Sequence, residues 1–228
     1  MQKVKKLIIA GGGETALLAN EYFSCDSGYE PVCFAMDKNV LPESKTMAGL
    51  PVECLDDIEN KYDPSAYDVF VAVSGKQLNY PRTELCCRMK EKGYKLASYV
   101  SSDCSIWRTA EIGDNCFVLS QTILQPFSRI CDNVFLWVRS NIGHRSVVEE
   151  NCFLATVDVA GFSRVGHNSY LGVHSIVADE RIIGHDNYLG MDCCIAKNTK
   201  PNSLYVGNPA KKQPISAREF CGVEERDV

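Results

Sequence analysis

Apolar residues recur every six positions over much of the second half of the chain. In "IIGHDNYLGMDCCIAKNTK", residues 182–200, the branched residues Ile183, Leu189 and Ile195 stand six apart. An amphipathic helix repeats its apolar positions about every 3.6 residues, and a half-buried strand every two. Neither spacing accounts for this segment, so the pattern predicts a structural unit of six residues.

The six-residue repeat extends backwards in two unbroken series. The first is Ile112, Val118, Leu124, Ile130, Leu136, Ile142, Val148 and Leu154; the second is Val165, Leu171, Val177, Ile183, Leu189 and Ile195. Val165 follows Leu154 by 11 residues, which is one short of two repeats. We therefore expect one shortened turn, which the pattern places near 160–164.

Many of these apolar residues are followed four positions later by a small one. The small residues are Cys116, Thr122, Ser128, Ser140, Ser146, Cys152, Ser169, Ser175, Cys193 and Thr199. One branched and one small inward residue per six fit a short strand and a sharp bend, and three bends would close a coil of about eighteen residues. Residues 112–200 should form about five coils. We expect Ile112, Ile130, Val148, Val165 and Ile183 to stack on one face.

The first hundred residues show a different organisation, in which strands alternate with helices. We predict strands at 7–10, 31–37 and 67–75, a helix from about Glu14, and a second helix over 81–94 with Pro81 near its start. Such alternation predicts a small Rossmann-like parallel sheet covered by helices. The predicted domains are 1–100, 101–212 and a C-terminal tail, 213–228.

Three glycines lie between the first predicted strand and the first helix. Gly11, Gly12 and Gly13 would let backbone N–H groups approach a phosphate at the helix N-terminus, although a tight structural turn would need them too. The segment is not a full GxGxxG motif, because Ala16 occupies the position of its third glycine. Asp37 ends the second strand, where such sheets hold a ribose or base; the alternative is a surface acid. These four residues are the candidate nucleotide site.

Composition and charge narrow the classes of function. The chain has 228 residues, 45% of them apolar, and a net charge of −5 with no basic stripe, so nucleic acid is not an expected partner. The twelve cysteines show neither a CxxC pair nor a metal-ligand spacing. Without a signal peptide or a long apolar run, the sequence predicts a cytoplasmic protein with no membrane span, whose reduced cysteines act mostly as small core residues.

A glycine-turn sheet domain followed by a hexapeptide repeat resembles the sialic-acid and bacillosamine type of sugar acyltransferase, which has a left-handed parallel β-helix. The resemblance covers about residues 4–212 and includes the closing "YVGNPAKK", which is similar to the family's terminal G-x-P-A-K. It implies a homotrimer that uses acetyl-CoA and binds a nucleotide-linked sugar in its N-terminal domain. By position, it also implies a coenzyme groove lined by Phe153, Gly172, Val173, Gly190 and Met191.

The four histidines are His144, His167, His174 and His185. The resemblance implies that His144, within "SNIGHRSVVEEN", is the catalytic base, and a histidine can accept a proton near neutral pH. His167 and His185 are eighteen residues apart and should stack on adjacent coils. Hexapeptide-repeat carbonic anhydrases need three histidines at one interface to bind zinc, and this pair supplies two. We therefore expect no metal.

Two positions depart from the family pattern. Relatives often have an acidic residue directly after the catalytic histidine and a second histidine nine residues after the first, whereas this chain has Arg145 and Phe153. The group that orients His144 is thus open, with Glu149, Glu150 and Asp158 as candidates. Backbone N–H groups would have to stabilise the thioester oxygen.

The resemblance implies acetyl-CoA-dependent N-acetylation of a nucleotide-linked amino sugar in bacterial surface-glycan synthesis. O-acetylation of a sugar and transfer of a larger acyl group are alternatives on the same fold. A non-catalytic nucleotide-binding β-helix is the alternative from another class of function. The sequence does not identify which nucleotide or which sugar the substrate contains.

Overall fold

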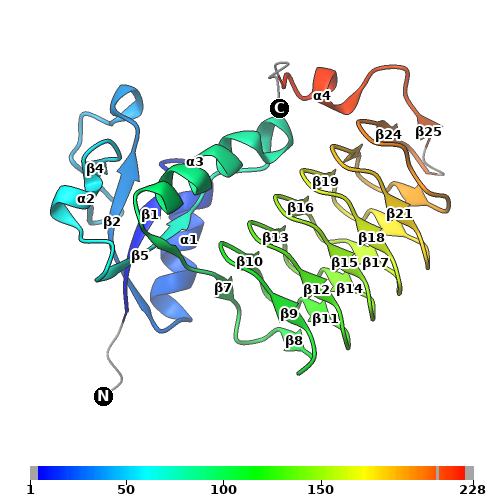
Figure 1. The fold of residues 1–228 in the computed structure, drawn as a ribbon, viewed down its shortest axis with the longest axis horizontal. Helices are drawn as coiled ribbons and strands as arrows, with labels where there is room; N and C mark the ends of the chain where they lie inside the picture. The colour runs from blue at the N-terminus through cyan, green and yellow to red at the C-terminus, as the bar shows by residue number, and fades with distance from the viewer. Residues whose placement is uncertain (1–4, 209–210, 224–228) are drawn as a thin grey trace. The chain divides into compact units, whose positions relative to one another are not determined.

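The chain forms two compact units, shown by a computed structural model that describes residues 5–208 and 211–223 (Figure 1). The N-terminal unit consists of the chain up to Ser74 together with Arg82–Tyr99. The coil unit consists of Gly75–Pro81 and the chain from Val100 onward. The segment Gly75–Pro81 therefore belongs to the coil unit although it lies within the first hundred residues.

The N-terminal unit contains a six-stranded sheet in the order β3-β4-β2-β1-β5-β6, in which β3 alone pairs antiparallel. The strands are β1 (Lys5–Ala10), β2 (Tyr29–Met36), β3 (Thr46–Met47), β4 (Leu50–Cys54), β5 (Tyr67–Val71) and β6 (Lys95–Leu96). The helices are α1 (Glu14–Cys25), α2 (Ile58–Lys61), α3 (Tyr80–Glu91) and the short 3₁₀ turn η1 (Lys38–Val40). Leu7 to Ala10 are fully buried, as a central parallel strand requires.

The three strands and two helices predicted for this unit are confirmed, with small differences at their ends. The sequence analysis missed β3, β4, β6 and the single-turn helix α2. β4 contains Pro51 and is half-exposed, and β6 has two residues, so neither has a clear alternation of apolar and polar positions. The detailed Rossmann-like arrangement and the functional meaning of the domain boundaries stay predictions.

The coil unit is a three-sided parallel β-helix of short strands. One sheet contains β7 (Tyr99–Val100), β10 (Phe117–Val118), β13 (Phe135–Leu136), β16 (Phe153–Leu154), β19 (Tyr170–Leu171), β22 (Tyr188–Leu189), β24 (Leu204–Val206) and the antiparallel β25 (Lys211–Lys212). The second contains β8 (Ser105–Ile106), β11 (Ile123–Leu124), β14 (Asn141–Ile142), β17 (Asp158–Val159), β20 (Ile176–Val177) and β23 (Cys194–Ile195). The third contains β9 (Glu111–Ile112), β12 (Arg129–Ile130), β15 (Val147–Val148), β18 (Arg164–Val165) and β21 (Ile182–Ile183).

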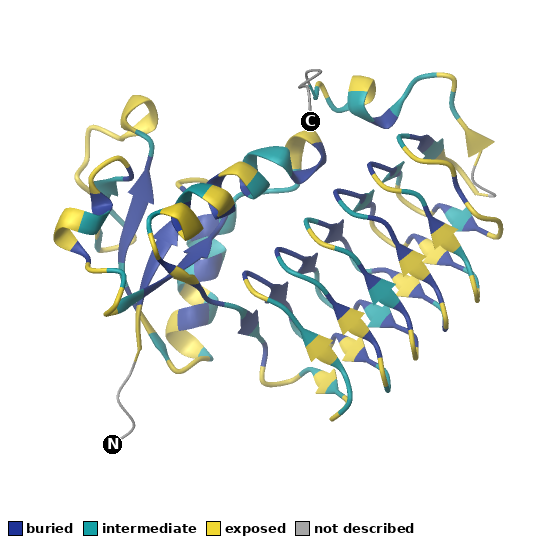
Figure 2. Ribbon diagram, viewed as in Figure 1, coloured by how far each residue is buried: buried dark blue, intermediate teal, exposed yellow. Residues whose placement is uncertain are grey.

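The core of the coil unit is the column of apolar residues predicted from the six-residue repeat. Every position of the two series is buried except Ile112, which is partly buried and packs against the others. Ile112, Ile130, Val148, Val165 and Ile183 are successive partners in the third sheet, as predicted. The small residues predicted to point inward are also buried. Figure 2 shows buried residues (dark blue) in every coil, and exposed residues (yellow) that lie mainly on the strands of the second and third sheets.

The predicted position of the shortened turn is wrong. The residue is missing between β16 and β17, which are joined by three residues, Ala155–Val157, whereas four residues separate every other pair of successive strands from β7 to β23. Strand partners are accordingly 17 apart across this turn, as in Asn141 with Asp158, and not 18. The second series therefore begins at Val159, which is buried, five residues after Leu154 and six residues before Val165. The regular turn at 160–163 is intact.

The twelve cysteines are all free, but the expectation that most of them lie in the core is wrong. Five are buried, five are half-buried and two are exposed. Burial raises the pKa of the Cys116 thiol to about 12, so this cysteine is a neutral core residue. Pro209 and Ala210 of the closing "YVGNPAKK" lie outside the described residues.

Candidate functional site

The N-terminal unit contains a pocket of about 310 Å³ at the carboxyl ends of β1 and β2. Its lining residues are Gly11, Gly12, Gly13, Met36, Asp37, Val40, Leu55, Val73 and Leu85. The structure thus brings together all four residues that the sequence suggested for nucleotide binding. The carboxyl edge of a parallel sheet is where such sheets bind ligands.

The three glycines have different physical roles in this pocket. Gly11 has φ of +142°, and a Cβ there would lie 2.6 Å from the Ala72 carbonyl oxygen, so the turn itself requires glycine. Gly13 is the N-cap of α1 and provides no side-chain cap, which leaves first-turn N–H groups for a ligand. A Cβ at Gly13 would meet no atom within 4 Å. The backbone at Gly13 is therefore the part of the turn most open to an anion.

Asp37 follows β2 at the rim of the pocket and is already paired. Its Oδ1 accepts a hydrogen bond from Arg88 Nη2 on α3 at 2.7 Å, and its side chain is 46% exposed. Arg88 places a cation beside this carboxylate, and the sequence analysis did not single it out. Glu14 adds a negative charge to the first turn of α1, and Arg88 also lies 3.9 Å from a carboxylate oxygen of Asp56.

Replacing Gly13 by valine should weaken the binding of a nucleoside diphosphate at least about tenfold, because its side chain enters open space where the anion would sit. Binding of UDP, dTDP and GDP by calorimetry measures this. Gly28→Val is the matched control, since a Cβ at Gly28 also meets no atom within 4 Å and Gly28 lies outside the pocket. Equal binding by the two variants would remove the glycine turn from nucleotide recognition. Gly12→Val is a less specific test because its Cβ would meet Met36 Sδ at 2.3 Å.

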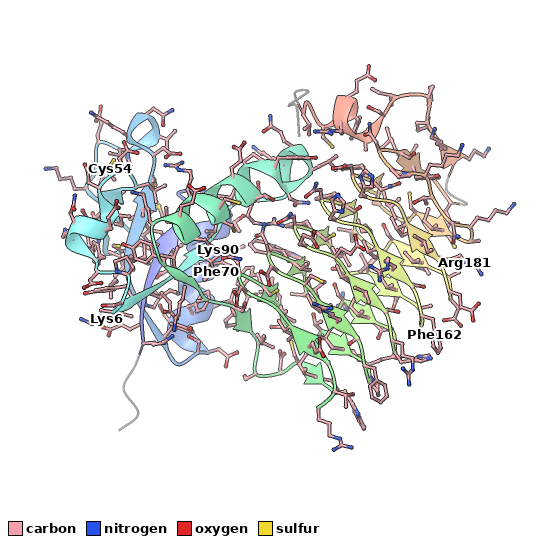
Figure 3. All side chains as sticks on the ribbon, in the orientation of Figure 1. Lys6, Cys54, Phe70, Lys90, Phe162 and Arg181 are labelled. Atoms are coloured by element: carbon pink, nitrogen blue, oxygen red, sulfur yellow. The ribbon has the colours of Figure 1, made fainter. Side chains whose placement is uncertain are left out.

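His144 lies in the coil unit at the corner that follows the second sheet, in the turn Gly143–Ser146. Its side chain is exposed, and its ring contacts the Phe162 ring edge-on at 4.9 Å. Figure 3 shows Phe162 at the outer edge of the coils. The Arg145 guanidinium packs 4.7 Å from the Phe127 ring one coil earlier. His144 thus stands among exposed aromatic rings, with a cation on the next residue.

The residue above His144 on the next coil is Gly161, which the sequence analysis did not identify. A Cβ at Gly161 would lie 2.5 Å from His144 Cε1, so this glycine gives the imidazole its place against the coil. Gly161 follows His144 by 17 residues, and aligning the coils with the shortened turn correctly placed would have revealed it.

A chain of amide side chains connects the His144 turn to Asp158. The His144 backbone N–H donates to Gln125 Oε1 at 3.1 Å, Gln125 Nε2 donates to Asn141 Oδ1 at 3.2 Å, and Asn141 Nδ2 donates to Asp158 Oδ1 at 3.1 Å. Of the three acids proposed to orient His144, Asp158 is therefore linked to the His144 turn. The link ends at the backbone N–H of His144 and does not reach its ring. Glu149 instead pairs with Arg164 and His167.

Four of the five residues suggested for the coenzyme groove lie together. Gly172 with Val173, and Gly190 with Met191, occupy the same corner on adjacent coils, where a Cβ at Gly172 would lie 2.8 Å from the Met191 nitrogen. Val173 and Met191 are 45% and 74% exposed. Phe153 is separate from them: its ring is buried and stacks on Tyr170 at 5.2 Å. The exposed surface at this corner therefore does not include the Phe153 ring.

His167 and His185 stack at a third corner, as predicted, with ring centroids 4.7 Å apart and parallel planes. His185 Nδ1 lies 2.7 Å from Asp186 Oδ2, and Asp186 Oδ1 accepts hydrogen bonds from Tyr80 Oη at 2.9 Å and Asn168 Nδ2 at 3.1 Å. Burial raises the pKa of the Asp186 carboxyl, but the hydrogen bonds from His185, Asn168 and Tyr80 have the larger effect. The pKa of Asp186 therefore lies below its ordinary value.

Several solved structures, acetyltransferases among them, share this fold. The acetyltransferase domain of PglB from Neisseria gonorrhoeae FA1090 is 23% identical, with 92% of this chain and 100% of that chain covered and a TM-score of 0.82. PerB from Caulobacter crescentus, solved with CoA and GDP-perosamine, is 20% identical over 92% of this chain and 98% of that chain, with a TM-score of 0.81. WeeI from Acinetobacter baumannii AYE is 19% identical over 92% of this chain and 100% of that chain, with a TM-score of 0.70.

These neighbours confirm, at the level of fold, the resemblance to hexapeptide-repeat sugar acetyltransferases seen in the sequence. The chain is rich in parallel sheet and matches left-handed β-helix acetyltransferase structures. No family model matches the chain. In the part of the chain that the structure describes, no helix has both the length and the apolar character to cross a membrane.

Proposed function

We propose that the protein is an acetyl-CoA-dependent N-acetyltransferase that acts on a nucleotide-linked amino sugar. The observation that supports this most is the exposed histidine at a corner of a β-helix that closely matches acetyltransferase structures. The neighbours solved with acetyl-CoA and with CoA and GDP-perosamine support both co-substrates by analogy. The pocket beside Gly11–Gly13 would bind the nucleotide.

In the proposed reaction the sugar amine attacks the carbonyl carbon of the acetyl thioester directly. His144 accepts the proton that the amine loses, the C–N bond forms, and the C–S bond breaks to release CoA as a thiol once it has gained a proton. No acyl-enzyme forms. Backbone N–H groups at the coil corners are the available donors to the developing oxyanion, since Phe153 cannot donate.

We propose a homotrimer in which the surface that presents Gly172, Val173, Gly190 and Met191 on one subunit faces the His144 corner of another. Val173 and Met191 are exposed apolar side chains, which suits contact with the pantetheine arm of CoA or with a second chain. Phe153 would contribute to that groove only by supporting it, because its own ring is covered. Cytoplasmic localisation stays a prediction from the sequence.

Replacing Gly161 by alanine should lower kcat by up to about 10²-fold while the fold stays intact. Its Cβ would displace the His144 ring, and a shift of about 1 Å at a catalytic group can have this effect. The backbone at Gly161 does not require positive φ, so alanine is compatible with the turn. Asp179→Ala, at the same corner position one coil further on, is the control. An unchanged kcat in Gly161→Ala would mean that the position of the His144 ring does not govern the reaction.

The experiment that tests the proposed function is an acceptor screen. The purified chain is incubated with acetyl-CoA and with 3-amino or 4-amino sugars linked to UDP, dTDP or GDP, and free thiol is measured. We expect one nucleotide-sugar to give rapid thiol release that needs both substrates. Thiol release with the corresponding hydroxy sugar but not the amino sugar would favour O-acetylation, and none with any acceptor would reject the proposal.

A further inference from the structure

The stacked histidines of the third corner are each faced by a carboxylate through the same ring nitrogen. His185 Nδ1 lies 2.7 Å from Asp186 Oδ2, and His167 Nδ1 lies 3.5 Å from Glu149 Oε2. A carboxylate oxygen accepts hydrogen bonds, so it favours the tautomer in which Nδ1 bears the hydrogen. Each ring then has its lone pair on Nε2.

One nitrogen of each ring and a carboxylate oxygen of Asp186 lie within 4.8 Å of one another, which is close enough for a single metal ion. The rings are parallel and their centroids are 4.7 Å apart, so an ion at the edge of the stack would be within reach of one nitrogen of each ring. The two side chains are 40% and 45% exposed, so solvent and ions reach them. An imidazole held by a carboxylate on one nitrogen with the other nitrogen free is the usual state of a metal-binding histidine.

The acid at position 186 is a departure from the pattern of this corner. In the coils before it the equivalent position is an asparagine, and these form a ladder in which Asn115 Nδ2 donates to Asn133 Oδ1 at 3.0 Å and Asn133 Nδ2 to Asn151 Oδ1 at 2.9 Å. Asn168 continues the ladder and donates to Asp186. An asparagine at 186 could accept the same hydrogen bonds from Asn168 and Tyr80. The carboxylate adds a fixed negative partner for His185.

We propose that His167 and His185 bind one divalent transition-metal ion through their Nε2 atoms, with Asp186 and Glu149 holding the two rings. Two imidazoles suit zinc, nickel, cobalt or copper, and not magnesium or calcium, which prefer oxygen ligands. Water or a further ligand would complete the coordination. The site lies at a different corner from His144 and takes no part in the proposed acetyl transfer.

The two rings must rotate out of their parallel stack to bind one ion. Zinc–nitrogen distances are about 2.0–2.1 Å, so two tetrahedral ligand nitrogens lie roughly 3.4 Å apart. The in-plane lone pairs of parallel rings do not converge, so each ring must rotate towards the ion as well as approach its neighbour, which half-exposed side chains can do. The sequence analysis expected no metal because a third histidine is lacking. The spacing of the histidines did not reveal that a carboxylate faces each of the two rings.

The test measures binding of Zn²⁺ and Co²⁺ to the full-length, untagged chain after chelator treatment and alkylation of accessible thiols. We expect one ion per chain and a Co²⁺ absorption spectrum without thiolate charge-transfer bands. His167→Gln and His185→Gln should each weaken binding by at least about tenfold, and Asp186→Asn by about 10- to 100-fold. Added Zn²⁺ should raise the Tm of the parent, because the ion binds the native state, and should leave these variants unaffected.

His174→Gln is the matched control, since His174 is an exposed histidine at another corner, with 62% of its side chain exposed. It should bind Zn²⁺ as the parent does. The proposal is overturned if the parent shows no stoichiometric binding, or if the affinity of both His167→Gln and His185→Gln equals that of His174→Gln. Circular dichroism of each variant establishes that a loss of binding does not reflect unfolding.

Discussion

Replacing Ile183 by aspartate is expected to prevent the protein from folding. Ile183 is fully buried in the apolar column and pairs with Val165 on the preceding coil. The change loses about 1.5–3 kcal/mol of apolar burial and places a carboxylate without a partner in the core, at a further cost of several kcal/mol. Since domains are stable by about 5–15 kcal/mol, the sum is enough to unfold the unit.

The neighbouring residue provides a matched control for this change. Ile182 belongs to the same strand but points outward and is 51% exposed, so Ile182→Asp should fold. Far-UV circular dichroism and the Tm of the two variants measure the contrast. If Ile183→Asp folded with the Tm of the parent, the inward position of the six-residue repeat would be wrong. Equal unfolding of both variants would show that the strand does not distinguish its two faces.

Replacing His144 by alanine is expected to lower kcat by about 10² to 10⁴-fold while both substrates still bind. This is the usual contribution of a general base, and the side chain is exposed at a corner where its loss leaves no cavity in the core. His144→Asn, which can form hydrogen bonds but cannot act as a base, should be nearly as impaired. Steady-state kinetics and calorimetric binding of both substrates separate the effect on kcat from an effect on affinity.

The pH dependence shows whether the histidine or the substrate accounts for the need for a base. The kcat/KM of the parent should rise with pH through one ionisation, but the sugar amine could give the same rise by losing its own proton. This rise of kcat/KM with pH should disappear in His144→Ala if the histidine causes it, and it should persist if the sugar amine causes it. A near-normal kcat in His144→Ala would exclude the histidine from the chemistry.

The sequence predicted the coil unit well because each coil repeats the same local requirement. Every branched residue of the six-residue series must point inward, so a pattern such as Val118, Leu124 and Ile130 is visible without any knowledge of distant contacts. The shortened turn was misplaced because Val159 was not included in the series. When one turn loses a residue, the six-residue spacing is kept on both sides of it. Because Val159 points inward and is six residues before Val165, the missing residue must come before Val159, at Ala155–Val157.

Contacts between distant parts of the chain could not be predicted from the pattern. Tyr80 binds Asp186 across more than a hundred residues, and Arg88 binds Asp37 across 51. Neither contact follows from a local period, because each depends on how separate segments pack. The same holds for the link between Gln125 and His144: the glutamine is one coil away, and which of its neighbours it contacts is decided by side-chain geometry.

The candidate sites were predictable to different degrees for the same reason. The glycine turn and Asp37 lie at adjacent carboxyl ends of parallel strands, so their common pocket follows from strand order. Phe153 was assigned to a groove by position in a family, but its place in the strand turns the ring into a stack with Tyr170. The Gly161 contact with His144 needs the corrected coil register, which the structure provides.

The central claim is that the protein transfers an acetyl group from acetyl-CoA to the amine of a nucleotide-linked sugar. The measurement that tests it most directly is mass spectrometry of the sugar product formed from isotope-labelled acetyl-CoA, with hydroxylamine treatment to distinguish an amide from an ester. We predict one labelled acetyl group per sugar, stable to hydroxylamine, formed at a rate that requires His144. An intact, unlabelled nucleotide-sugar after prolonged incubation, or a label that hydroxylamine removes, would contradict it.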